Sequence, residues 1–108
     1  MTDEELKELI EATLDIPVYD DGMSITYPAA TLDIYQDSSA LAGDGATKAR
    51  VKNVKIDLWY QNKEERDTAQ ALLLGMLDGI RTASCVEILP CFDTNARKYR
   101  STFNFEIL

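Results

Sequence analysis

The chain has 108 residues, of which 45% are hydrophobic, and a formal net charge of −8. This length suits one domain with one core and leaves no room for a separate substrate domain, so we expect residues 1–108 to form a single domain. The acidic balance disfavours a dedicated nucleic-acid-binding module or binding to an anionic membrane. No apolar run approaches the roughly 20 residues of a membrane span and the start is acidic, so we expect no membrane contact.

The first residues predict a short amphipathic helix. Thr2 is placed as its N-cap and Glu5 completes a capping box, because the two side chains can satisfy each other's backbone amides. The apolar positions of this helix are Leu6, Leu9, Ile10, Thr13 and Leu14. The helix should end before Pro17, and the Asp-Gly step within residues 16–28 predicts a small hairpin or an irregular crossing.

Residues 30–37 alternate, which places Leu32 and Ile34 on one face of a strand and Asp33 and Tyr35 on the other. A longer strand should begin near Thr47. Its apolar face comprises Val54, Ile56, Leu58 and Tyr60. Three cations occupy the same face before these positions, namely Lys48, Arg50 and Lys52. Burying three cations is costly, so we expect this strand to protrude from the body as part of a long β-hairpin.

The stretch LAGDGATKAR, residues 41–50, raises the question of a phosphate-binding loop. Its glycines, Gly43 and Gly45, do not have the spacing that such a loop needs before a Gly-Lys pair, and Asp44 would repel the anion. The following residues also predict a strand, whereas phosphate loops lead into a helix N-terminus. We therefore interpret residues 43–52, called the arm below, as a flexible glycine-jointed extension.

A second helix should begin after Asn62, its N-cap, with Glu65 at the third position. Its first turn is acidic, as the helix dipole favours. We expect an inward stripe of Ala69, Leu72, Leu73, Met76 and Ile80. Leu74 and Leu77 widen the apolar surface, which indicates either a thick core, the interpretation we favour, or a contact between subunits.

Two strands should close the chain. Pro90 confines the first to a sheet edge or ends it. The second alternates cleanly, with Tyr99, Ser101, Phe103, Phe105 and Ile107 on one face. Together the elements predict an α+β fold: an antiparallel sheet of about four to five strands, two helices on one face, and the long protruding hairpin.

Few residues favour catalysis. Histidine is absent, which removes the commonest general base and metal ligand. Asp20 and Asp21, next to Gly22, are typical of a solvated turn. Together with Asp44 they do not have the spacing of ligands in a calcium-binding loop. We expect no enzyme activity, cofactor or metal.

The two cysteines, Cys85 and Cys91, lie about 20 Å apart if the segment between them is extended, so we expect free thiols in a reducing compartment. Trp59 and Tyr35 are placed on the more polar faces of their strands. There Trp59 is either a binding anchor or is covered by a second helix, and both interpretations stay open.

Three segments carry a resemblance to a known family: the acidic helix at 2–14, the strand-to-helix passage at 51–77, and the closing strand at 99–108. In this pattern of elements the sequence resembles the tail terminator, or tail-completion, proteins of long-tailed (siphovirus-type) bacteriophages and prophages. The resemblance implies a small α+β subunit that forms a ring, usually sixfold, at the capsid-proximal end of the tail tube. It implies a virion protein made in the host cytoplasm.

The implied partners are further copies of the chain in a ring, the major tail tube protein and a head-completion or connector protein. DNA would pass through the lumen without specific binding, which an acidic lining permits. The arm would reach a neighbouring subunit or the tube, with its cations facing acids of the next subunit. The expected interface residues are Gly43, Asp44, Gly45, Lys48, Arg50, Lys52, Trp59, Glu64, Glu65 and Asp67. Alternatives are another head–tail junction ring protein and a small acidic inhibitor or immunity-type protein, with an enzyme third.

Overall fold

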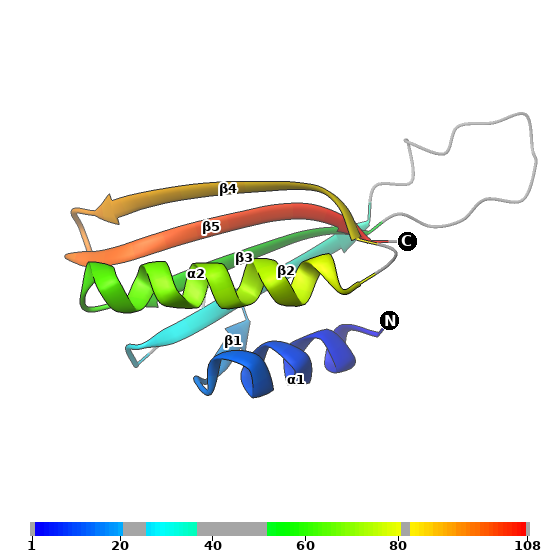
Figure 1. The fold of residues 1–108 in the computed structure, drawn as a ribbon, viewed down its shortest axis with the longest axis horizontal. Helices are drawn as coiled ribbons and strands as arrows, with labels where there is room; N and C mark the ends of the chain where they lie inside the picture. The colour runs from blue at the N-terminus through cyan, green and yellow to red at the C-terminus, as the bar shows by residue number, and fades with distance from the viewer. Residues whose placement is uncertain (1, 21–25, 37–51, 81–82, 108) are drawn as a thin grey trace, which may run out of the picture.

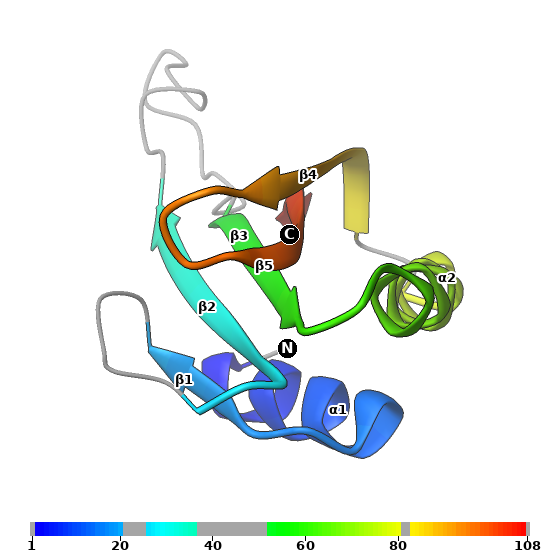
Figure 2. The ribbon, with the colours of Figure 1, turned by 90° about the vertical axis from the view of Figure 1, so that its left-hand side faces the viewer.

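The computed structural model describes residues 2–20, 26–36, 52–80 and 83–107 (Figure 1). Along the chain the elements are α1 (Asp3–Leu14), β1 (Val18–Asp20), β2 (Ala29–Gln36), β3 (Lys52–Tyr60), α2 (Lys63–Asp78), β4 (Ala83–Asp93) and β5 (Lys98–Ile107). The strands form one five-stranded sheet in the order β1-β2-β3-β5-β4. Figure 2 shows both helices on the same side of the curved sheet, so the predicted α+β class is confirmed.

The sheet is mixed and not wholly antiparallel as predicted, because β1 pairs with β2 in parallel, with Val18 opposite Ala30, while all other pairs are antiparallel. Of the two alternatives predicted for residues 16–28, the small hairpin is therefore wrong, and the irregular crossing stays a prediction because residues 21–25 lie outside the described residues. A hairpin needs its second strand to start directly after the turn. Here β2 begins only at Ala29, and the amide of Ala30 donates to the carbonyl of Pro17, so β2 starts alongside the start of β1.

Both predicted helix starts are confirmed. Thr2 and Glu5 form the reciprocal capping box of α1, with bonds of 3.0 and 3.1 Å. On α2, the Asn62 side chain accepts a 2.8 Å bond from the amide of Glu65. Each cap satisfies amides that the first helical turn leaves without partners, so local sequence determines where each helix begins.

The core lies between the helices and one face of the sheet. The predicted alternation is confirmed from Val54 to Tyr60 on β3 and from Ser101 to Ile107 on β5, where the inward residues are buried, whereas Tyr99 is only half-buried. The buried residues of the core include Leu6, Ile10, Val54, Ile56, Leu58, Leu73, Leu77, Phe103, Phe105 and Ile107. Burial of these side chains is the main stabilising term for a domain of this size.

The predicted inward stripe of α2 is partly wrong. Leu72 is 50% exposed, whereas Leu73 is fully buried and Leu77 nearly so. The buried positions are Arg66, Ala69, Leu73 and Leu77, a stripe with helical spacing that starts at a charged residue. The prediction used hydrophobicity alone and so left out Arg66. The predicted buried face of α2 is therefore rotated about the helix axis toward Leu72, relative to the observed one.

Pro90 lies on β4, an edge strand, as predicted, since an edge position leaves room for a residue without an amide donor. The pairing of β4 with β5 shifts register between Ser84 and Glu87. The predicted long hairpin and the arm up to residue 51 fall outside the described residues. Of the three arm cations, only Lys52, the first residue of β3, is described.

Candidate functional site

An aromatic and cationic cluster occupies the face of the sheet opposite the helices. The ring of Trp59 meets Tyr27 edge to face, with centroids 6.1 Å apart, and the guanidinium carbon of Arg100 lies 5.3 Å from the Trp59 centroid. Lys98 Nζ lies 4.8 Å from the centroid of Tyr27. We call these four residues the aromatic cluster. Among the described residues, side chains of the sheet face and of the segment before β2 neighbour Trp59, and both described helices lie on the other face, so the role of Trp59 as a binding anchor stays a prediction.

A buried polar pair lies beside this cluster on the same face. Asp57 is only 5% exposed, and Thr102 Oγ1 donates to its Oδ1 at 2.5 Å. Lys55 Nζ lies 3.8 Å from the other carboxylate oxygen. Trp59 Nε1 donates to Thr31 Oγ1 at 3.3 Å. These bonds orient the polar side chains of the face, as buried polar groups require.

Arg100 connects the cluster to the edge strand. Its Nη1 lies 3.4 Å from Asp93 Oδ2 on β4. Burial opposes its charge, but the Cys91 thiol, Asp57 and Asp93 outweigh this effect and raise the pKa of Arg100 above its ordinary value. An arginine is a cation at any ordinary pH, so this side chain places a positive charge over the Trp59 ring and beside the Asp93 carboxylate.

A second candidate surface is a groove between α1 and α2, which we call the acidic groove. Its volume is about 440 Å³. The buried residues Leu14, Tyr60 and Ala69 line it together with the half-exposed Leu72, and the exposed Glu64 and Glu65 contribute its acidic part. Burial, and to a smaller extent Glu65, raises the pKa of Tyr60, so its phenol stays neutral. The groove thus offers an apolar surface beside two carboxylates.

The acidic groove belongs to a strongly acidic helical layer. Helices α1 and α2 contain nine acidic and three basic residues, a net charge of −6 out of −8 for the whole chain. Asp67, a predicted interface residue, already binds Arg66 Nε at 2.7 Å and is half-exposed. Of the predicted interface acids, Glu64 and Glu65 therefore line the groove and Asp67 does not.

Lys52 has a partner within its own chain. Its Nζ binds Asp3 Oδ1 on α1 at 3.1 Å, although the sequence analysis expected it to face acids of a neighbouring subunit. The pair connects the start of β3 to the start of α1. Gly43, Asp44, Gly45, Lys48 and Arg50 lie outside the described residues, so their predicted interface role stays a prediction.

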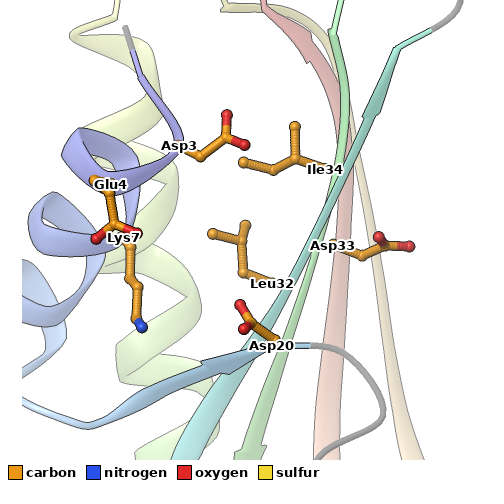
Figure 3. Close-up of a pocket in the computed structure, with 7 residues that line it drawn as sticks. All are labelled: Asp3, Glu4, Lys7, Asp20, Leu32, Asp33 and Ile34. Carbon is orange, nitrogen blue, oxygen red and sulfur yellow. The ribbon is translucent and has the colours of Figure 1, made fainter.

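A smaller cleft of about 270 Å³ lies between α1 and β2 (Figure 3). Leu32 and Ile34 point from β2 toward α1, while Asp33 points away from it. Asp3, Glu4, Lys7 and Asp20 complete the lining. Over the described part of the chain, no group of three or more potential metal ligands comes together. Asp21 falls outside that part, so the expected solvated turn at Asp20 and Asp21 stays a prediction.

Sequence reasoning missed one organising residue, Arg66. It is 6% exposed, and its Nη1 donates to the carbonyls of Cys91 at 3.3 Å and Arg100 at 2.9 Å. Its guanidinium also lies 5.8 Å from the ring centroid of Tyr99. The missed signal was the helical spacing that joins position 66 to the buried positions that follow it on α2.

The thiol of Cys91 is free, as expected, and the expectation for Cys85 stays a prediction. None of the helices in the described ranges has the length and apolar character of a membrane span. Compared with known proteins, the chain matches no protein-family model and no curated protein.

Proposed function

We propose that this chain is a structural, ring-forming subunit of a long-tailed bacteriophage, a tail terminator that caps the tail tube and joins it to the head connector. The resemblance of its helix, strand-to-helix passage and closing strand to that family motivates the proposal. A small α+β domain with helices on one face of the sheet is compatible with it. In this role the chain assembles and does not catalyse.

The observation that carries the proposal is the chemical difference between the two faces of the subunit. The helical layer has a net charge of −6. The opposite sheet face carries aromatic rings with Lys98 and Arg100 against them, and ion pairs of Lys55 with Asp57 and of Arg100 with Asp93. Copies with two chemically different faces can contact one another through unlike surfaces, which generates rings. An acidic layer facing the lumen would let DNA pass without holding its phosphates.

The proposed contact with the tube involves the arm. Of the three arm cations, Lys52 binds Asp3 within the chain, so the proposal assigns the contact with the tube to Lys48 and Arg50. Acidic patches on a tube protein would complement them. A different ring protein of the same head–tail junction would use the same surfaces and differs only in its neighbours.

The acidic helical layer also favours a second function, that of a small inhibitor or immunity-type protein that covers a basic active site. Assembly separates the two. A terminator should form rings alone or on tail tubes prepared from the same phage, whereas an inhibitor should stay a monomer or dimer and ignore the tubes. Analytical ultracentrifugation of the protein, alone and with tubes, distinguishes these outcomes.

A further inference from the structure

The turn between β4 and β5 presents an apolar side chain next to a cation. Phe92, near the end of β4, is 48% exposed although its ring packs edge to face on Tyr99. Arg97 is exposed and has a φ of 55°, a left-handed conformation that Gly or Asn adopts more easily. We call Phe92 and residues 94–97 the hairpin tip.

The hairpin tip is held in a defined position. Asp93 Oδ1 accepts a 2.9 Å bond from the amide of Ala96, which closes the turn. Arg66 binds the carbonyls of Cys91 and Arg100, one on each strand of the hairpin. Such a preorganised tip loses little conformational entropy when it binds.

The acidic groove has the complementary chemistry. Leu72, half-exposed at its edge, is an apolar contact for a ring such as that of Phe92, and Glu64 and Glu65 suit a guanidinium. Four large apolar side chains of the described residues are exposed, namely Tyr35, Leu72, Leu89 and Phe92. One of them, Leu72, lies in the acidic groove, and another, Phe92, lies in the hairpin tip. The two surfaces are therefore complementary both in their apolar side chains and in their charges.

We propose that the hairpin tip of one copy of the chain docks in the acidic groove of a second copy. Phe92 then contacts Leu14 and Leu72, while Arg97 pairs with Glu64 and Glu65. This inference rests on the proposed function insofar as that function requires copies to associate, and it names the two surfaces that meet. In this contact Glu64 and Glu65 form ion pairs with Arg97 of the neighbouring copy, and not with the cations of its arm.

The occupant is a second copy because the two surfaces cannot meet within one chain. The groove lies on the side of α2 that faces α1, whereas the turn between β4 and β5 curves away from α2 (Figure 2). Arg66 anchors the hairpin in that position. A contact between two different surfaces is heterologous, so repetition of it builds a ring or a filament.

The test uses two charge-reversed variants of the full chain, Arg97→Glu and the double variant Glu64→Lys/Glu65→Lys. Sedimentation over a range of concentrations should show wild-type self-association. Each variant alone should raise the dissociation constant at least about tenfold, since like charges then meet at the contact. An equimolar mixture should associate again, because each tip then faces a groove of opposite charge, alternately along the assembly.

Matched controls separate the contact from general charge effects. Glu4→Lys/Glu8→Lys makes the same charge change on α1 and should associate like wild type. Arg97→Asn should raise the melting temperature, because Asn suits a left-handed φ, and still weaken association.

Three results would overturn the docking: a wild-type protein that stays monomeric, variants that associate normally, or a mixture that does not recover. Capping of tail tubes is measured separately. A protein that caps tubes but fails these tests retains the proposed function and loses this contact.

Discussion

Arg66 of α2 donates a 2.9 Å hydrogen bond to the backbone carbonyl of Arg100 on β5. The same nitrogen reaches the carbonyl of Cys91 on β4, so one buried side chain joins the helix to both strands of the hairpin. Arg66 therefore fixes the position of the hairpin tip relative to α2. The pattern of apolar residues along α2 does not predict this role.

Arg66→Ala should lower the free energy of unfolding by at least about 1.5–3 kcal/mol, because charged hydrogen bonds to buried carbonyls are lost. Urea denaturation measures the change. Asp67→Asn is the control: it removes the charge of the half-exposed partner, keeps an oxygen that can accept from Arg66 Nε, and should cost less than about 1 kcal/mol. Equal midpoints for wild type and Arg66→Ala would show that the carbonyl bonds contribute nothing.

Leu72 and Leu73 are adjacent but differ in burial, 50% exposed against 0%. Leu73→Ala should therefore destabilise the fold by about 2–5 kcal/mol through loss of buried area and creation of a cavity. Leu72→Ala should stay within about 1 kcal/mol of wild type, since a half-exposed side chain loses little buried area. Thermal or urea unfolding compares the two, and the reverse ranking would mean that the face of α2 is assigned wrongly.

The Asp57–Thr102 pair should be energetically coupled. Thr102→Val keeps the shape of the side chain but leaves a buried carboxylate without its hydroxyl donor, at an expected cost of about 1–3 kcal/mol. A double-mutant cycle with Asp57→Ala measures the coupling. If the two effects simply add within about 0.5 kcal/mol, the hydrogen bond is not a stabilising interaction.

Tyr60 should titrate above its ordinary pKa of about 10, because burial first and Glu65 second disfavour its phenolate. Above the ordinary pKa the folded state keeps the Tyr60 proton that the unfolded state releases. The contribution of Tyr60 to the free energy of unfolding is therefore complete below pH about 10 and is lost as the pH rises above that value. Tyrosine ring-carbon NMR shifts, with Tyr60→Phe for assignment, follow the titration. Glu65→Gln should lower the Tyr60 pKa only part of the way, and no change would exclude Glu65 as a contributor.

Local signals in the sequence predicted local structure well. Thr2 and Asn62 cap the helices as expected, and the alternation of β3 and β5 assigned the core face of both strands. Pro90 indicated the edge strand. These features depend on residues close in the chain, whose hydrogen bonds and side-chain directions follow from backbone geometry alone.

Features that depend on distant segments were not predictable in the same way. The parallel pairing of β1 with β2 depends on where β2 begins, and the contacts of Trp59 with Tyr27 and Arg100 depend on strand register. Arg66 is buried because carbonyls on β4 and β5 receive its charge. From its polarity alone an arginine is expected on the surface. Arg66 is buried instead because its hydrogen-bond partners on β4 and β5 compensate for the loss of water.

The most direct test of the proposed function is the capping of tail tubes. Tubes from the same phage would be grown with and without the protein and imaged by electron microscopy. The account predicts a ring at one end of each tube and arrested growth from that end. Tubes of unchanged length with no ring at either end would contradict it.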